Sequence, residues 1–101
     1  ILNYKKEIAL KYQNFFETHE IAYFMEPSNA QSNFWLNAIL LKSKKDRDLF
    51  LKSTNSAGVM TRPIWKLMTS LQMYKTCQQS SLFNAHWLQS RVVNIPSGVH
   101  L

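Results

Sequence analysis

Apolar side chains recur every three or four positions at the start of the chain, a spacing that predicts an amphipathic helix. The positions that set this spacing are Tyr4, Ile8, Tyr12, Phe15 and Phe16. Asn3 can cap such a helix, but Lys5 and Lys6 would oppose the helix dipole if they lay in its first turn. We therefore expect the helix, and the protein, to begin upstream of Ile1.

Two short apolar runs follow this helix, and each predicts a strand. They span residues 21–25 and 34–41, and the polar segment 26–33 between them contains Pro27. Proline within a polar segment is typical of a loop, so we expect the two strands to be joined by one.

A second helix is predicted over residues 43–58. Ser43 or Asp46 can cap its start, and Gly58 is suited to the left-handed turn that commonly follows a helix. The next apolar run, residues 59–64, predicts a third strand.

The last third of the chain is less regular. Residues 66–81 show no clear periodicity, and the polar residues 78–81 predict a flexible connection. Helical spacing returns over residues 82–90, and residues 92–95 form an extended apolar segment that Pro96 closes. The order helix, strand, strand, helix, strand, helix, strand predicts an α+β fold. We expect one small domain, residues 1–101, with helices layered on a largely antiparallel sheet.

The composition is that of a folded globular domain. Apolar residues make up 46% of the 101 residues, so the chain has enough material for a core. The net charge of +6 would suit a nucleic acid, but the lysines are scattered among most of the acids and no recognition motif accompanies them. We favour a solubilising charge over nucleic-acid binding.

The longest apolar run, residues 34–41, is far below the roughly 20 residues that a membrane span needs. Cys77 is the only cysteine, so no internal disulfide can form, and a reducing compartment fits best. We expect a cytoplasmic protein that does not insert into a membrane.

No residue set predicts a catalytic or metal site. The histidines, His19, His86 and His100, are dispersed, and no cysteine or paired acid lies at ligand spacing from them. Asp46 and Asp48 lie at a helix start, where carboxylates complement the helix dipole. We favour capping over acid-base catalysis for this pair.

Arg62 is the strongest candidate for a binding residue. It lies on the short third strand between Thr61 and Pro63 and close to Trp65. A guanidinium held by a strand presents a flat fork of donors to a carboxylate or phosphate and keeps its charge. An arginine at a strand edge that pairs with a surface acid is an equally good interpretation of the pattern.

Two neighbours of Arg62 have alternative interpretations as well. Lys66 can supply a second positive group, or it can be a solvated loop lysine. Trp65, like Trp35, can face a ligand or belong to the core, where aromatic residues are common.

Several segments together resemble a known family. Residues 58–65, 71–74, 85–88 and 91–97 are similar to the C-terminal part of the DegT/StrS-type sugar-nucleotide aminotransferases. These are pyridoxal-phosphate enzymes of the aspartate-aminotransferase fold, and the resemblance covers nearly the whole chain. Residues 33–38 and 91–97 look especially like the branch that aminates UDP-linked 4-keto-6-deoxy sugars for bacillosamine and legionaminic-acid type glycans.

The resemblance implies a division of labour between two domains. A large N-terminal domain of the family holds pyridoxal phosphate and its Schiff-base lysine, and no segment here matches those motifs. The chain then looks like the C-terminal small domain, which alone binds no cofactor and is inactive. The resemblance implies that the parent enzyme, a homodimer, transfers an amino group from glutamate to a ketone on a nucleotide-linked sugar.

Within this small domain the resemblance implies a substrate-binding role for Thr61, Arg62, Trp65 and Lys66. Many family members have Pro-Leu-His where this chain has Leu67-Met68-Thr69, so a histidine contact to substrate is not expected here. Apolar side chains such as Tyr23, Phe24, Trp35 and Met68 would face the large domain. The alternative is a free-standing small module that binds an anion or nucleotide sugar without catalysis.

Overall fold

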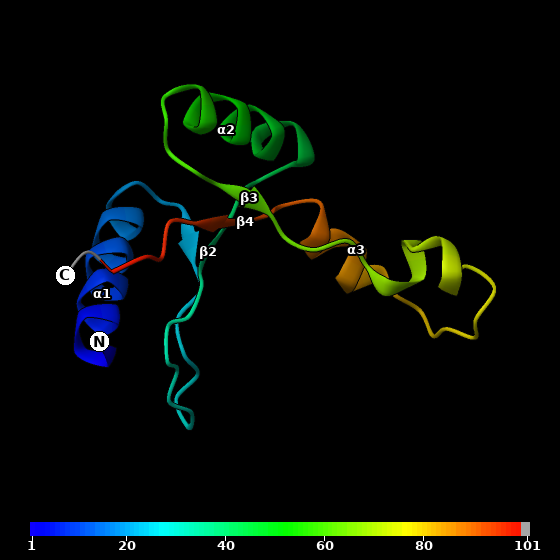
Figure 1. Cartoon of the computed structure of the whole chain (residues 1–101), viewed down its shortest axis with the longest axis horizontal. Coiled ribbons are helices and arrows are strands. Elements are labelled where there is room, and N and C mark those ends of the chain that lie inside the picture. Colours follow the sequence, from blue (N-terminus) through cyan, green and yellow to red (C-terminus); the bar gives the residue numbers. More distant parts are fainter. Residues whose placement is uncertain (100–101) are drawn as a thin grey trace.

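A single antiparallel sheet of four short strands organises the computed structural model, which describes residues 1–99. The strands are β1 (Ala22–Tyr23), β2 (Asn37–Leu40), β3 (Arg62–Pro63) and β4 (Val92–Ile95). Their order in the sheet is β1-β2-β4-β3, so the last strand of the chain lies inside the sheet (Figure 1). The predicted α+β class and the order of the main elements are confirmed.

Three α-helices and two 3-10 turns complete the fold: α1 (Leu2–Thr18), α2 (Lys44–Ser56), η1 (Met68–Ser70), η2 (Gln72–Tyr74) and α3 (Phe83–Gln89). The predicted signals hold at both ends of α2. Ser43 accepts a hydrogen bond from the Asp46 amide, and Gly58 follows the helix with a φ of +81°. The proposed cap at Asn3 is wrong, because α1 begins at Leu2 and has no side-chain cap.

Three strands are shorter than their apolar runs predict, and the run 21–25 forms a strand only at Ala22–Tyr23. The run 34–41 forms a strand only over Asn37–Leu40, because Phe34 has a φ of +51°, in the left-handed region, and turns the chain out of the extended conformation. The run 59–64 forms a strand only at Arg62–Pro63, where it can reach β4. The segment predicted as irregular, residues 66–81, contains the turns η1 and η2.

Both long helices cover the same face of the sheet. Ile39 and Val93 lie opposite each other in the β2–β4 register, and both are fully buried. Phe16 of α1 and Phe50 of α2 pack with them in one cluster. Side chains alternate between the two faces of a strand, so the residues next to Ile39 and Val93 point to the other face, which neither α1 nor α2 covers.

The core is small for the apolar content of the chain. Within residues 1–99, seven hydrophobic residues are buried, whereas 18 large hydrophobic residues are exposed. The accessible surface is 7841 Å², compared with about 5,900 Å² expected for a compact monomer of this mass. The radius of gyration is 15.3 Å, compared with about 13 Å for a compact domain. The chain leaves apolar surface uncovered.

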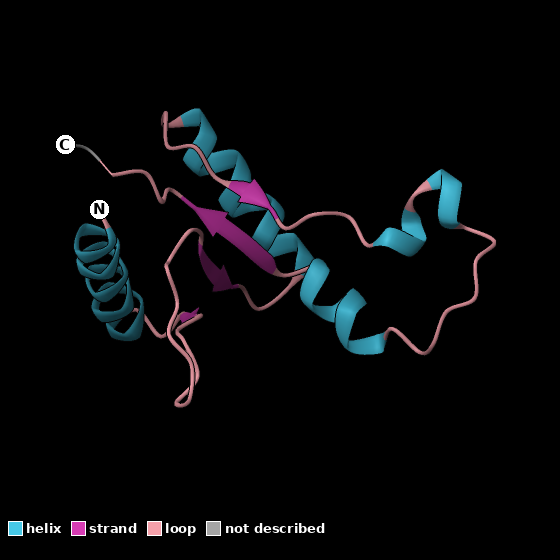
Figure 2. Ribbon diagram, turned by 60° about the horizontal axis from the view of Figure 1, so that its bottom comes forward, coloured by secondary structure: helices cyan, strands magenta, loops and turns pink. Residues whose placement is uncertain are grey.

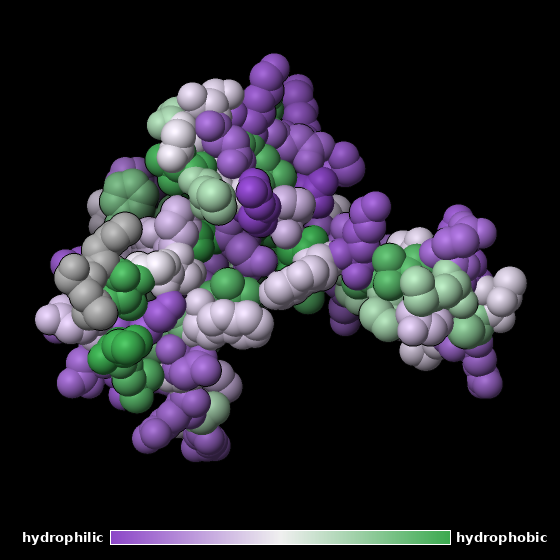
Figure 3. All heavy atoms as spheres, viewed as in Figure 1, coloured by the Kyte–Doolittle hydropathy of each residue, from purple (hydrophilic) through white to green (hydrophobic). Residues whose placement is uncertain are grey.

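The exposed apolar residues include most of those expected to face a larger domain. Phe24, Trp35 and Met68 are 46%, 68% and 60% exposed. Tyr23 is a correction: it packs against the core cluster and its hydroxyl donates to Asn37. The segment between β3 and β4 extends away from the sheet, which accounts for much of the exposure (Figures 2 and 3). None of the helices in residues 1–99 is long and apolar enough to cross a membrane.

We expect the isolated 101-residue chain to self-associate or to bind hydrophobic dyes, because contiguous exposed apolar surface is rarely stable in water. Sedimentation at several concentrations and dye fluorescence measure this. A strictly monomeric chain that binds no dye and melts in one steep transition would contradict the expectation and favour an independent domain.

A second prediction concerns alkaline pH. Burial, with a smaller contribution from nearby Tyr12, raises the pKa of Tyr23 from 10.0 to about 12. The unfolded chain then loses its Tyr23 proton at a lower pH than the folded chain does, so this contribution to stability is complete below pH 10 and is lost as the pH rises towards about 12. Denaturant unfolding at a series of pH values should show this decline, and Tyr23→Phe should flatten it. Equal declines in both proteins would contradict the assignment.

Candidate functional site

The candidate site lies on the face of the sheet that α1 and α2 leave open. Arg62 of β3 lies directly opposite Asn94 of β4 in the antiparallel register, and both point away from the face that carries Val93. Leu36 reaches the same side just before β2 begins. The β3–β4 register thus places the Arg62 side chain next to that of Asn94 on the open face of the sheet.

These residues line an open groove of about 440 Å³. Its lining combines four apolar residues, two cationic residues and one amide: Leu36, Pro63, Ile64, Trp65, Arg62, Lys66 and Asn94. The volume lies within the range of about 300–1,000 Å³ that is usual for small-molecule sites. An apolar lining with a few polar groups is the usual chemistry of such a site.

Arg62 has donors free for a ligand. Among residues 1–99, its side chain makes one hydrogen bond, a long one of 3.4 Å from Nη1 to the carbonyl oxygen of Thr61. The only ion pairs among residues 1–99 join Lys44 and Arg47 to Asp48. The alternative, in which Arg62 pairs with a surface acid, therefore has no support in the described part of the chain.

Thr61 lies next to Arg62 but faces the opposite way. Its side chain is 2% exposed, and its hydroxyl lies 2.6 Å from the Thr54 hydroxyl and accepts a 3.0 Å hydrogen bond from the Asn55 amide. Asn55 also donates to the Thr61 carbonyl. Thr61 is outside the groove lining and ties the start of β3 to the end of α2, which fixes the strand that carries Arg62.

The two other predicted residues, Trp65 and Lys66, do line the groove. Trp65 is 66% exposed, so its interpretation as a core residue is wrong, as it is for Trp35. Lys66 is exposed and has no ion-pair partner among residues 1–99. The structure therefore brings Arg62, Trp65 and Lys66 together.

Four groove residues were not predicted as site residues: Pro63 and Ile64, which belong to the predicted third strand, and Leu36 and Asn94, which lie on other segments. Asn94 carries a signal that could have been used, since it is the polar residue between apolar ones in β4. Its pairing with Arg62 depends on a register that only the folded sheet defines. Leu36 gave no signal, because its position follows from the unusual backbone at Phe34.

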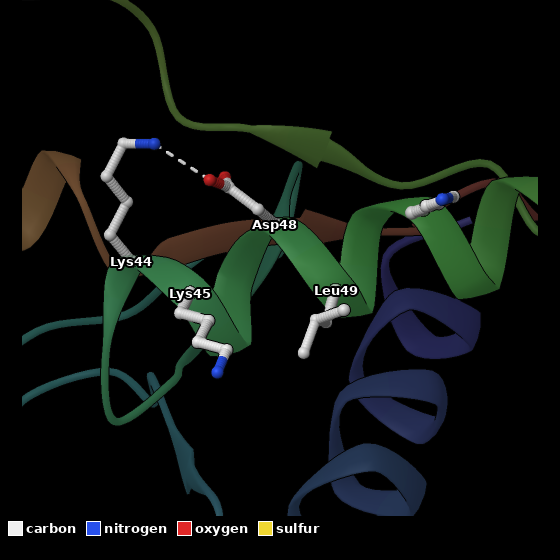
Figure 4. A pocket seen from close by; sticks show the side chains of 5 residues that line it. Lys44, Lys45, Asp48 and Leu49 are labelled. Carbon is white, nitrogen blue, oxygen red and sulfur yellow. Dashed lines mark hydrogen bonds and ion pairs between the residues drawn. The ribbon is translucent and has the colours of Figure 1, made fainter.

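A second depression, also of about 440 Å³, lies along α2. Lys44 and Asp48 point to one side of the helix and form a 2.7 Å ion pair, while Lys45 and Leu49 point to the other (Figure 4). Hydrogen bonds from Lys44 and then from Arg47 lower the pKa of the Asp48 carboxyl. These side chains are a solvated helix surface whose charges partly neutralise one another, so we prefer the Arg62 groove.

The described residues do not fit a pyridoxal-phosphate site. Such a site needs a lysine held in an enclosed pocket. Every lysine here is exposed except Lys5, whose ammonium donates to the Ser97 carbonyl oxygen. No cluster of three or more histidine, cysteine or acidic residues suited to a metal occurs in residues 1–99, and His100 lies outside them.

Two solved structures with the same fold are named sugar aminotransferases, and a third is named an aminotransferase. Spr1654 from Streptococcus pneumoniae, in its PMP form, superposes with a TM-score of 0.82 at 19% identity over 96% of this chain. TlmJ from Streptoalloteichus hindustanus, named an aminotransferase, gives 0.82 at 17% over 95%. CalS13 from Micromonospora echinospora gives 0.75 at 18% over 97%.

In each case the match covers 26% of the solved chain, so these 101 residues span about a quarter of the length of those proteins. No curated protein sequence matches this one. The model of the DegT/DnrJ/EryC1/StrS aminotransferase family matches residues 1–101. The chain belongs to the DegT/DnrJ/EryC1/StrS aminotransferase family.

Proposed function

We propose that the chain is the C-terminal small domain of a pyridoxal-phosphate-dependent aminotransferase of fold type I that acts on a nucleotide-linked sugar. The family match over the whole chain and the named activities of the structural neighbours support this proposal. The observation that supports a nucleotide-sugar substrate is the open groove, in which Arg62 and Lys66 lie beside apolar side chains. The anionic diphosphate of a nucleotide sugar joins a nucleoside to a sugar, so the molecule combines charge with rings and hydroxyls, which this lining matches.

The groove residues have distinct tasks in this proposal. Arg62 clamps a phosphate with two donors of its guanidinium, and Lys66 adds a point charge beside it. The ring of Trp65 packs against the base or the sugar, and the Asn94 amide donates to or accepts from a sugar hydroxyl. The groove thus orients the substrate and holds its charge, while proton transfer takes place elsewhere.

Pyridoxal phosphate, when bound to the rest of the enzyme, supplies the electron sink for amino transfer. The residues described here do not build its site, so we place that site in a large domain outside these 101 residues. The isolated chain then binds no cofactor and is inactive. We further propose a cytoplasmic homodimer that uses glutamate as the donor.

The finer assignment concerns the acceptor. We propose a UDP-linked 4-keto-6-deoxy sugar of the kind used for bacillosamine and legionaminic-acid type surface glycans. The segments that support it, residues 33–38 and 91–97, place Leu36 and Asn94 in the groove. Both side chains therefore lie where they can contact the substrate.

Arg62→Ala in the full-length enzyme should lower kcat/KM for the nucleotide sugar by about 10- to 150-fold, because a charge-assisted contact of roughly 1.5–3 kcal/mol is lost. Arg62→Lys should recover only part of this, since an ammonium lacks the bidentate fork. Steady-state kinetics measure both effects, and cofactor absorbance should stay unchanged.

Lys45→Ala on α2 is the matched control, because it removes an exposed positive charge outside the groove. It should leave kcat/KM nearly unchanged. If Arg62→Ala leaves kcat/KM intact, or lowers it only in step with the melting temperature, then Arg62 is a structural residue and the groove is not the substrate site.

Thr61→Val separates positioning from binding. The variant keeps the shape but removes a buried hydroxyl that Thr54 and Asn55 contact, so the free energy of unfolding should fall by about 1 kcal/mol. KM for the nucleotide sugar should change little at temperatures where the enzyme is folded. A large rise in KM without loss of stability, measured by kinetics beside denaturant unfolding, would show that Thr61 binds substrate directly.

A further inference from the structure

The segment between β3 and β4, residues 65–90, forms an arm that the rest of the described chain barely holds. It leaves the sheet after β3 and returns to it at β4, and both ribbon views show it reaching away from α1 and α2 (Figures 1 and 2). Its first part contains the turns η1 and η2, and its last part is α3.

Within residues 1–99, no hydrogen bond or ion pair ties the outer part of the arm to a segment distant in sequence. In residues 65–86 the backbone hydrogen bonds are local, such as those from Ser70 to Leu67 and from Cys77 to Tyr74. No side chain of residues 65–86 makes a hydrogen bond or an ion pair to any residue of the described chain. The first polar ties to the body lie at the end of α3, where Arg47 donates to the Gln89 carbonyl.

The arm is nonetheless rich in exposed apolar side chains. Met68, Met73 and Phe83 are 60%, 72% and 75% exposed. An ordered segment with few internal ties and this much apolar surface needs a partner that buries it. The accessible surface of the chain exceeds that of a compact monomer by about 1,900 Å², which is ample for one side of a permanent interface.

Charge indicates what the partner offers. The last acidic residue of the sequence is Asp48, so the arm carries Lys66 and Lys75 and no carboxylate. A second copy of this domain is a less complementary partner for the arm, because it also has a net charge of +6. An apolar surface edged by carboxylates is complementary to the arm.

We propose that the arm docks on the remainder of the aminotransferase chain, on an apolar surface edged by carboxylates, and that docking fixes Trp65 and Lys66 in the Arg62 groove. The solved relatives are about four times the length of this chain, so the polypeptide to supply that surface exists in them. Trp65 and Lys66 lie at the base of the arm and line the groove, so the order of the arm sets the shape of the site. The docking rests on the proposed assignment as the small domain of a longer enzyme, and the coupling rests on the proposed substrate as well.

Trypsin reports directly on docking in the full-length enzyme. Lys66 lies at the base of the arm, and Lys75 is the only lysine or arginine between residues 67 and 90, so cleavage in the outer part of the arm has one position. The wild-type arm should resist cleavage. Met73→Asp should raise the rate at Lys75 by about tenfold or more, because a carboxylate placed in an apolar, acid-edged contact opens it. KM for the nucleotide sugar should rise with it, while bound pyridoxal phosphate is retained.

Leu49→Asp is the matched control, since Leu49 is also exposed, at 53%, but lies on α2 away from the arm. It should leave the rate at Lys75 unchanged. Met73→Gln should act in the same direction as Met73→Asp but more weakly, which keeps the test valid if the charged variant fails to fold. Lys75→Gln in the Met73→Asp background should abolish the new cut and so assign it.

Three results would overturn docking on the enzyme's own remainder. The wild-type arm would be cut as fast as an unfolded peptide, or Leu49→Asp would expose Lys75 equally, or protection would depend on protein concentration and vanish with dissociation of the dimer. The last result would make the second subunit the occupant. A protected arm in an enzyme that does not aminate nucleotide sugars would instead support docking and refute the proposed function, so the two failures are distinguishable.

Discussion

The pairing of β2 with β4 is the interaction on which the rest of this structure depends. Each strand has four residues, and Ile39 faces Val93 across the pair with both side chains fully buried. The outer strands β1 and β3 have two residues each and exist only as additions to this pair. Both helices pack on the face that the pair presents, and Arg62 occupies its other face through one register position opposite Asn94. A shift of β4 by one residue would exchange the two faces and destroy core and groove together.

A network of hydrogen bonds also helps to fix the register of β2 and β4, because the core itself is small. Asn37 is 1% exposed. Its backbone N–H and its side-chain Nδ2 both donate to the Ser97 hydroxyl, and its side-chain Oδ1 accepts from the Tyr23 hydroxyl. Tyr12 and Lys5 of α1 donate to the carbonyl oxygens of Pro96 and Ser97. The segment after β4, which contributes to the family resemblance, therefore joins the two ends of the chain. Buried polar groups tolerate few geometries, because an unpaired one costs more than a paired one contributes.

The sheet has one face covered by helices and one open face. This division explains how a domain with so few buried residues can still hold binding residues in place. The covered face supplies rigidity through Ile39, Val93 and their partners from α1 and α2. The open face presents Arg62 on a strand that Thr61 ties to α2, and within the described residues the guanidinium makes only one long hydrogen bond. The open face also leaves apolar surface uncovered: 18 large hydrophobic residues are exposed within residues 1–99, and the chain spans about a quarter of the length of its solved relatives.

The sequence alone determined the elements whose signals are local. Helical spacing located α1 and α3, Ser43 and Gly58 marked the ends of α2, and the apolar run before Pro96 located β4. Helix caps and apolar periodicity act over a few residues, so they can be read along the chain. The family resemblance likewise depended on short motifs, and the family match confirms it at that level.

Only the tertiary structure decided which residues meet. The left-handed backbone at Phe34 shortened a predicted strand and brought Leu36 into the groove, and the β3–β4 register placed Asn94 opposite Arg62. It also turned Thr61 inward and Trp65 outward, although the two are four positions apart in one segment. These outcomes depend on contacts between residues tens of positions apart, and the sequence pattern of one strand carries no information about which strand lies beside it.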